Sequence, residues 1–367
     1  MARTSRPLVS VICPTYNRSQ AIVRTLESVR TQTVTDWELL VMSDGCTDDT
    51  EDWVRAAARE DERVRLVRTA RHGHPSGPRN EGLGLARGAY IAYIDHDDVW
   101  LENHLDVLLS LFGEGGELVA TGFRRRNRHG EVTASSDAFG LCWHPELQLL
   151  GPIFEPSRVA HRAGLAERVG GWRAGYGLED WDLWLRLADA GAVFTTAQDR
   201  TTELLDDPGT RRFSTPLRHR MPVAALDDPR LAHAVLTELR DGRHEAAFRA
   251  AAEADTRAWF ARLGTTPEFS VPRGWDGDMD AAIARAAVEA PPPWPDLVLV
   301  PEGGRYVVAQ RLWCADTEHA DRCTALTRST QREQFALVDA IVRRTAGSTG
   351  LLHSGPAPQP AAPVLSS

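Results

Sequence analysis

Three aspartates within four residues are the strongest chemical signal in this sequence. Asp95, Asp97 and Asp98 follow a run of strand-forming residues at 90–94. Carboxylates this close repel one another and raise one another's pKa unless a cation lies among them. Their oxygens suit Mg²⁺ or Mn²⁺, which proteins hold through one or two carboxylates plus substrate phosphates. The spacing therefore favours a metal–phosphate site over the alternative that Asp97 or Asp98 only caps the next helix, expected from about Leu101.

The elements that must position these carboxylates follow an alternating pattern. Strands are expected at 8–13, 37–42, 64–67 and 89–94, and helices at about 20–32, from 50 onward, and at 80–87. Such alternation predicts right-handed crossovers and a mainly parallel sheet with helices on both faces. In these sheets, ligands bind beyond the carboxyl ends of the strands. Residues 14–17, Asp44 and residues 95–97 all fall at such ends, so we expect one shared site.

Composition narrows the classes of protein. The chain has 367 residues, of which 42% are hydrophobic and 25% charged, as in ordinary globular proteins. A formal net charge of −9 argues against bulk binding to nucleic acid or anionic lipid. No apolar run has the length of a membrane span and residues 1–7 are polar, so we expect a cytoplasmic protein. The five cysteines contain no C-x-x-C pair, which predicts reduced thiols, and the absence of lysine excludes any mechanism that needs one.

One glycine-rich segment resembles a dinucleotide-binding fingerprint. It is Gly-Leu-Gly-Leu-Ala-Arg-Gly at residues 82–88. A true fingerprint follows a strand and opens a helix, so that phosphate meets the helix N-terminus. These glycines lie inside an expected helix and precede a strand. We therefore expect close packing of helix on sheet, with Gly88 as the C-terminal cap.

A second group of carboxylates lies at residues 179–186. A helix from about Glu179 would bury Trp181, Trp184, Leu185 and Ala188. Asp182 and Arg186 would pair on an outer face at i, i+4. Asp180 would lie at the helix start beside the apolar stripe, where burial raises its pKa and the helix dipole lowers it. The residues alone leave a catalytic base and a helix-capping or dipole carboxylate as equal alternatives.

Other side chains are weaker candidates. Trp143, Trp172 and Trp181 could stack on the ring of a ligand, but tryptophans at helical spacing are more often core residues. The arginine-rich run at 124–128 precedes a turn at 129–130. It could attract an anionic ligand, but a solvated hairpin tip is more typical of such a run.

Several motifs, in order, resemble family 2 glycosyltransferases of the GT-A fold. They are Val-Ser-Val-Ile-Cys-Pro-Thr-Tyr-Asn-Arg at 9–18, Ser-Asp-Gly-Cys-Thr-Asp-Asp-Thr at 43–50, Arg-Asn-Glu-Gly at 79–82, Asp-His-Asp-Asp at 95–98, His-Arg at 161–162, Val-Gly-Gly-Trp at 169–172 and the segment 179–186. The resemblance covers roughly residues 7–192. It implies an α/β protein with a Rossmann-like, mixed and mostly parallel sheet flanked by helices.

The resemblance also implies a donor-binding set. Its residues would be Pro14, Thr15, Tyr16, Asn17, Asp44, Arg79, Asp95 and His96, with Asp44 near the base and no specific role for His96. The donor would be a nucleotide sugar, with UDP-sugar expected and GDP- or dTDP-sugar as alternatives. Ser43 stands where the family usually has the first of two aspartates, which weakens any inference about which nucleotide base is bound.

For the chemistry, the resemblance implies a cation and a base. Asp97 with Asp95 would bind Mn²⁺ or Mg²⁺, while Asp98 would cap the helix that follows. His219 or His161 could complete the metal shell, although a lone histidine is more often structural. Asp180, with Glu179 beside it, would be the catalytic base. The expected reaction is a metal-dependent, inverting transfer of one sugar to an acceptor that could be a small molecule, a saccharide or a peptide.

Two alternatives remain. Residues 95–99 also fit the Asp-x-Asp-x-Thr/Val pattern of haloacid dehalogenase-like phosphatases, but those enzymes usually need a lysine and carry the motif after the first strand. A catalytically inactive GT-A module would bind nucleotide sugar without turnover. The Gln-x-x-Arg-Trp motif of processive family members is absent, which favours a single transfer.

The chain beyond the resemblance is divided by pattern alone. We expect a glycosyltransferase domain at 1–225, a helical segment at 226–290, a small α+β region at 291–345 after a proline boundary at 291–293, and a disordered tail at 346–367. The α+β region should contain a hairpin at 297–312 and a helix through 335–341. The oligomeric state stays open, with a dimer through this region as one alternative.

Overall fold

The computed structural model describes residues 6–174, 177–206, 219–289, 296–314 and 317–349. The chain forms two compact units, each of which combines segments that are distant in sequence. The first contains the described parts of Met1–His219, Thr256–Ala286 and Trp313–Thr330, and the second those of Arg220–Asp255, Ala287–Leu312 and Gln331–Ser367. The expected domains are continuous in sequence and these units are not; the domain boundaries after residues 225, 290 and 345 stay a prediction.

The first unit is built around a mixed sheet, which has nine strands within the described residues. The strands are β1 (Val9–Thr15), β2 (Trp37–Ser43), β3 (Val64–Arg68), β4 (Tyr90–Tyr93), β5 (Val99–Trp100), β6 (Leu118–Asn127), β7 (Val132–Ser135), β8 (Val159–Arg162) and β9 (Phe194–Asp206). Their order is β3-β2-β1-β4-β8-β6-β9-β5, with β7 paired to β6. The strands β3, β2, β1 and β4 are parallel, whereas β8 is antiparallel to both neighbours. The expected α/β architecture with a mostly parallel N-terminal sheet is confirmed.

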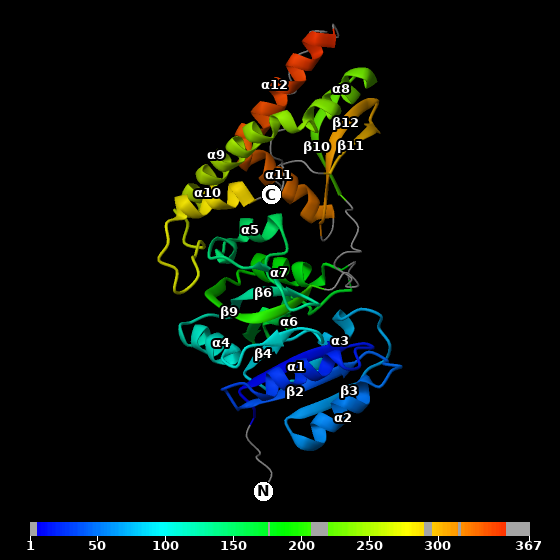
Figure 1. The fold of residues 1–367 in the computed structure, drawn as a ribbon, viewed down its shortest axis with the longest axis vertical. Coiled ribbons are helices and arrows are strands. Elements are labelled where there is room, and N and C mark those ends of the chain that lie inside the picture. The colour runs from blue at the N-terminus through cyan, green and yellow to red at the C-terminus, as the bar shows by residue number, and fades with distance from the viewer. Residues whose placement is uncertain (1–5, 175–176, 207–218, 290–295, 315–316, 350–367) are drawn as a thin grey trace, which may run out of the picture. The chain divides into compact units, whose positions relative to one another are not determined.

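Helices cover both faces of this sheet (Figure 1). They are α1 (Ala21–Arg30), α2 (Thr50–Glu60), α3 (Ser76–Leu85), α4 (His104–Gly113), α5 (Pro145–Leu150), α6 (Leu165–Arg168) and α7 (Glu179–Asp189). Successive residues of β1 point to opposite faces, as a strand requires. Val11 packs in a core with α1, α2 and α4, and Ile12 packs in a second core with α3, α6 and α7. Because both faces are covered, every residue of β1 is buried.

Helix α3 approaches β1 closely because glycine occupies the contact. A Cβ atom on Gly82 would lie 2.7 Å from Cγ2 of Ile12, which confirms the expected close packing. The expected helix cap at Gly88 is wrong, since α3 ends earlier and Ala86 is its C-cap. A Cβ on Gly88 would instead lie 2.5 Å from the backbone nitrogen of Ser10. Close passage of two backbones, rather than a helix end, requires glycine at that position.

Asp98 does not cap a helix, contrary to the sequence prediction. The chain after it forms the short strand β5, and α4 begins only at His104, with Asn103 as its N-cap. The Asp98 carboxylate accepts hydrogen bonds from Ser157 Oγ at 2.5 Å and from the backbone N–H of Leu205 at 3.1 Å. Pairing of β5 with β9 carries the chain away from Asp98 before the helix can begin.

The second unit contains a sheet of three strands within the described residues. Its strands are β10 (His219–Leu226), β11 (Leu297–Glu302) and β12 (Arg305–Leu312), in the order β10-β12-β11. The helices α8 (Pro229–Leu239) and α12 (Arg332–Thr349) share an apolar core with this sheet. The expected hairpin and the helix through 335–341 are confirmed.

The remaining helices complete the described chain. They are α9 (Glu245–Leu263), α10 (Met279–Glu289), α11 (Thr317–Thr330) and the 3-10 helices η1 (Phe139–Leu141), η2 (Pro156–Arg158) and η4 (Gly242–His244). The helices α8, α9 and α10 lie within the expected helical segment at 226–290, and the sequence analysis missed α11. The expected tail begins too early, because residues 346–349 belong to α12, while 350–367 and the proline boundary at 291–293 lie outside the described residues. No described helix is both long and apolar enough to cross a membrane.

Candidate active site

A cavity of about 770 Å³ lies in the first unit at the carboxyl ends of β1, β2 and β4. Its lining includes every residue predicted for donor binding and for the base, together with Asp97: Pro14, Thr15, Tyr16, Asn17, Asp44, Arg79, Asp95, His96, Asp97, Glu179 and Asp180. The structure therefore brings these residues together in one place, although Pro14 and Asp180 are 166 positions apart in the sequence. Strand ends in an α/β sheet converge in this way because parallel strands share one carboxyl edge.

Arg79 connects the two groups of carboxylates in this cavity. Its Nη2 donates to Asp95 Oδ1 at 2.7 Å, and its Nη1 lies 4.0 Å from Glu179 Oε1. The guanidinium also lies over the ring of Trp172, 4.4 Å from the centroid. Arg79 is buried, and these carboxylates offset the cost of removing its charge from water. The start of α7 is thereby held next to the aspartates that follow β4.

Asp97 and His96 form a second electrostatic group. Burial raises the pKa of Asp97, and the charge of Asp95 raises it further, whereas His96 and Arg18 lower it. The Nε of Arg18 lies 2.8 Å from His96 Nε2 and 3.9 Å from Asp97 Oδ2. Burial lowers the pKa of His96, which favours its neutral form. A buried carboxylate with a raised pKa gains most from an added positive charge.

The loop after β3 surrounds Asp44. Its carboxylate accepts hydrogen bonds from the backbone N–H groups of His72 at 2.6 Å and Gly73 at 2.9 Å, and it forms an ion pair with Arg71. The Arg71 guanidinium lies over the Tyr16 ring, 3.5 Å from its centroid. The sequence analysis missed Arg71, although it follows a predicted strand and the rule of strand ends could have found it.

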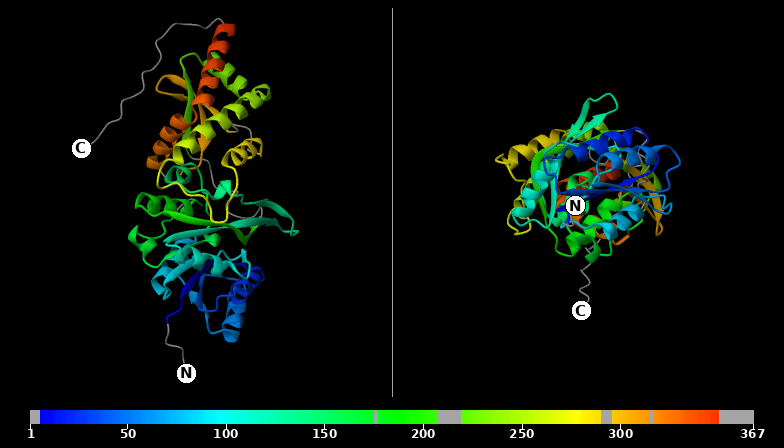
Figure 2. Two further views of the ribbon diagram at one scale, coloured as in Figure 1. Left: turned by 90° about the vertical axis from the view of Figure 1, so that its left-hand side faces the viewer. Right: turned by 90° about the horizontal axis from the view of Figure 1, so that it is seen from below.

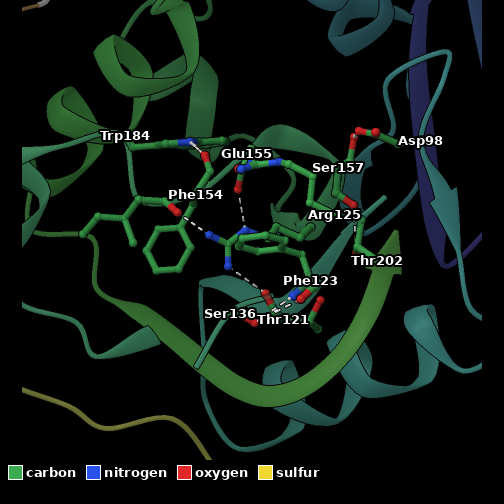
Figure 3. Close-up of polar contacts among 12 residues, drawn as sticks. Asp98, Thr121, Phe123, Arg125, Ser136, Phe154, Glu155, Ser157, Trp184 and Thr202 are labelled. Carbon is green, nitrogen blue, oxygen red and sulfur yellow. Dashed lines mark hydrogen bonds and ion pairs between the residues drawn. The ribbon is translucent and has the colours of Figure 1, made fainter. Parts of the chain in front are cut away.

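Ser157 connects Asp95 and Asp98 through its side chain. Its Oγ accepts the backbone N–H of Asp95 at 2.9 Å and donates to Asp98 Oδ2 at 2.5 Å (Figure 3). Burial raises the pKa of Asp98 well above its usual range, with Asp97 and Asp95 adding to the effect. Asp98 lies in the interior and therefore fixes the position of Asp95 through Ser157.

Asp180 occupies the first turn of α7. Its Oδ1 accepts the backbone N–H of Trp181 at 2.8 Å. Burial, followed by the charge of Glu179, raises the pKa of Asp180 to about 7, although Arg79 and the hydrogen bond lower it. Burial, which the sequence analysis expected to raise this pKa, is the largest effect on it. A carboxyl group with this pKa can take up a proton near neutral pH.

Several other candidates lie elsewhere. His161 is buried, and its two ring nitrogens interact with the Tyr93 hydroxyl and the Arg162 carbonyl, each at 2.8 Å. Burial lowers its pKa to about 4. His219 begins β10 and is not among the residues that line the cavity, so its role as a ligand stays a prediction. Trp143, Trp172 and Trp181 are buried, as expected for core residues, and Asp182 pairs with Arg186 at 2.6 Å.

The arginine run at 124–128 ends β6, whose hairpin with β7 extends outward (Figure 2). This confirms the expected hairpin, but Arg125 also lines the cavity. Glu155 and Trp313 line it too, and the sequence analysis missed both. They lie in connections with no motif, so no local signal could have found them.

Comparison with known proteins shows which family the sequence resembles. Residues 10–168 match the family model described as glycosyl transferase family 2. An uncharacterized glycosyltransferase of Rickettsia felis is 27% identical over 232 residues, which are 61% of this chain and 38% of that protein. The UDP-Glc:alpha-D-GlcNAc-diphosphoundecaprenol beta-1,3-glucosyltransferase WfgD of Escherichia coli is 39% identical over 106 residues, or 28% of this chain and 40% of that protein. The match thus spans less than half the length of each of these two relatives.

A solved structure extends the comparison to the fold. The crystal structure of S. aureus TarS 1-349 in complex with UDP-GlcNAc aligns with 94% of this chain and 93% of that one, at a TM-score of 0.51 and 15% identity. At this identity the likeness concerns the fold alone, and it agrees with the expected GT-A architecture.

Proposed function

Because residues 10–168 match the model of glycosyl transferase family 2, we propose that this protein is a metal-dependent, inverting glycosyltransferase that moves one sugar from a nucleotide-diphospho-sugar to an acceptor nucleophile. The observation that carries the proposal is the single cavity lined by Asp95, Asp97 and Asp180. It supplies acidic ligands for a donor on one side and a carboxyl group with a pKa of about 7 on the other.

The donor side fits a divalent cation. Among the described residues, no group of three or more His, Cys, Asp or Glu side chains is arranged to hold a metal ion by itself. Asp97 and Asp95 would therefore share the cation with donor phosphates and water, which is how Mg²⁺ and Mn²⁺ are usually bound. The bound cation would stabilise the negative charge that grows on the diphosphate as it leaves. The raised pKa of Asp97, caused by burial, supports this assignment.

Asp180 acts as the general base in this proposal. The carboxylate takes the proton of the acceptor hydroxyl, whose oxygen forms a new bond to the anomeric carbon. The bond from that carbon to the diphosphate oxygen breaks, and the nucleoside diphosphate leaves with the electron pair. Attack from the face opposite the leaving group inverts the configuration. Glu179 raises the pKa of Asp180, and Arg79 holds Glu179 and Asp95 in one geometry.

The donor is expected to be a UDP-sugar, with GDP- and dTDP-sugars as alternatives. The E. coli relative is named for a UDP-Glc donor, which favours the same nucleotide for this chain. Nothing in the comparisons supports the haloacid dehalogenase-like alternative. The cytoplasmic location and a dimer through the C-terminal region stay predictions.

A thermal-shift panel tests the donor and the metal together. Melting of the full chain is followed with UDP, GDP, dTDP and CDP, each with and without Mn²⁺. A ligand that binds only the folded state stabilises it by about 2.7 kcal/mol at one hundred times its Kd. We expect one nucleotide to raise the melting temperature, more with Mn²⁺ than without, and the Asp97→Asn variant to lose the Mn²⁺-dependent part.

The Asp180→Asn variant is the matched control because it should keep the nucleotide shift and lose turnover. No shift with any nucleotide in the wild-type protein would refute the proposal. Nucleotide binding by wild-type protein without turnover of any nucleotide sugar would favour the inactive-module alternative.

A further inference from the structure

One wall of the cavity is made of residues outside the motifs after β1, β2 and β4. This acceptor-side wall consists of Phe123, Arg125, Ile153, Glu155, Leu178 and Trp313. The charge of Glu155 contributes to the raised pKa of Asp180, after burial and Glu179. Glu155 therefore lies within electrostatic reach of the base. An acceptor hydroxyl must approach that base, so this wall is where the acceptor would bind.

Arg125 and Glu155 form an ion pair that the interior holds in place (Figure 3). Arg125 Nη2 donates to Glu155 Oε1 at 2.7 Å, and the buried Arg158 donates from Nε to Oε2 at 2.9 Å. Arg158 also donates to the backbone carbonyls of Thr121 and Ile153, which fixes its orientation. Glu155 thus accepts from both arginines, one on each carboxylate oxygen. At the cavity, Arg125 and Glu155 present a hydrogen-bond donor and an acceptor side by side, an arrangement that suits the hydroxyl groups of a ligand.

Trp313 adds an aromatic surface to the same wall. Its side chain is 42% exposed, which is unusual for tryptophan in this chain, and it comes shortly before α11. The first turn of α11 is attached beside the base. There the His319 ring packs at 90° on Trp181, with centroids 4.5 Å apart, and its Nε2 lies 2.8 Å from the Leu149 carbonyl oxygen. Trp181 directly follows Asp180, and Trp313 lines the same cavity as Asp180.

We infer that the acceptor-side wall binds the ring of a saccharide, with Trp313 against an apolar face of the sugar and the Arg125–Glu155 pair hydrogen-bonded to its hydroxyls. The inference rests on the proposed function and names its acceptor class. A pyranose ring has C–H faces and hydroxyl edges, which match an aromatic surface beside a paired donor and acceptor. A purely aromatic acceptor would contact Trp313 and make no hydrogen bonds to this pair.

The test compares wild-type protein with Trp313→Ala, Trp313→Phe and Trp53→Ala. Trp53 is the matched control because it is 39% exposed on α2 and is not among the residues lining the cavity. The acceptor probes are methyl glycosides of glucose, galactose, mannose and N-acetylglucosamine, and the disaccharides cellobiose, maltose and lactose. The comparison probes are p-nitrophenol and glycerol 3-phosphate. The assay follows nucleoside diphosphate release from nucleotide sugars of the base that the thermal-shift panel selects, with and without each probe.

We expect a saccharide to stimulate this release. Trp313→Ala should raise the acceptor KM about tenfold, as expected for the loss of an aromatic contact. The donor KM and the acceptor-independent hydrolysis of the donor should not change, Trp313→Phe should keep most of the acceptor affinity, and Trp53→Ala should behave as wild type.

An acceptor KM that Trp313→Ala leaves unchanged would overturn the inference, and so would stimulation by the phosphorylated or aromatic probe alone. Donor hydrolysis that no saccharide stimulates would also overturn it while leaving the proposed function intact. A wild-type protein that neither binds nor hydrolyses any nucleotide sugar would refute the proposed function itself.

Discussion

Protonation of Asp180 gives the sharpest prediction, because its pKa lies near 7 rather than at the usual 3.8. If Asp180 is the base, only its ionised form is active, so the transfer rate should rise with pH and level off above about pH 8. A group with a pKa of about 7 is only about 9% ionised at pH 6 and about 1% at pH 5. A base with the ordinary aspartate pKa would be fully active at both values.

The same difference in pKa predicts an effect on stability. A pKa raised by folding means that the folded protein binds this proton more tightly than the unfolded chain, so stability falls as pH rises from about 4 to about 7. The interval between 3.8 and about 7, at about 1.36 kcal/mol for each pH unit, gives at most about 4 kcal/mol. Solvent screening of a half-buried carboxyl reduces this limit. Asp180→Asn should therefore be inactive and yet more stable than wild type at pH 8.

Two assays check these expectations. The first is the rate of acceptor-stimulated nucleoside diphosphate release between pH 5 and 9, for wild type and for Glu179→Gln. Removing the Glu179 charge lowers the pKa of Asp180, so the acidic limb should move to lower pH in that variant. The second is urea unfolding of wild type and Asp180→Asn at pH 4 and pH 8, where the two proteins should differ mainly at pH 8.

Three results would refute this reasoning about Asp180. A rate that stays constant down to pH 5 would show that no group with a pKa near 7 controls the reaction. An Asp180→Asn protein that loses donor binding would assign Asp180 to the donor side. Equal stability of the two proteins at pH 8 would show that burial of this carboxylate costs little.

Three further predictions concern the metal, the packing and a buried histidine. Asp97→Asn should lower the transfer rate about 10²- to 10³-fold and abolish Mn²⁺-dependent donor binding, and wild-type activity in that variant would reject the metal assignment. Gly82→Ala should destabilise the protein by about 1–3 kcal/mol, because the new Cβ would lie 2.7 Å from Ile12. Gly84→Ala should stabilise it by about 0.5–1 kcal/mol, because a Cβ there meets nothing within 4 Å and alanine favours the helix. Chemical denaturation measures both changes. The pKa of His161 is lowered from 6.5 to about 4, so its contribution to stability should be complete above pH 6.5 and be lost as the pH falls toward 4. His161→Gln should make the free energy of urea unfolding less dependent on pH across that range.

The sequence alone was sufficient to predict which of these segments line one cavity. Pro14 to Asn17, Asp44 and Asp95 to Asp97 were grouped because they follow successive strands, and strand ends of a parallel sheet share one edge. The Asp98 prediction failed for a physical reason that no local pattern carries. Its partner Ser157 lies 59 residues away, and the short strand β5 separates Asp98 from the helix.

Local sequence thus determined which chemical groups are present and which strand ends carry them, because the periodicity of strands and helices is a local property. Only the tertiary structure decided the state of those groups. Burial and the charge of Glu179 raise the pKa of Asp180, whereas Arg79 and the hydrogen bond from Trp181 lower it, and these effects cannot be summed before the chain packs. Likewise, Glu155 and Trp313 line one cavity only in the folded chain, in which η2 packs against β4, β6 and β9, and α11 contacts Trp181 and Leu149 through His319.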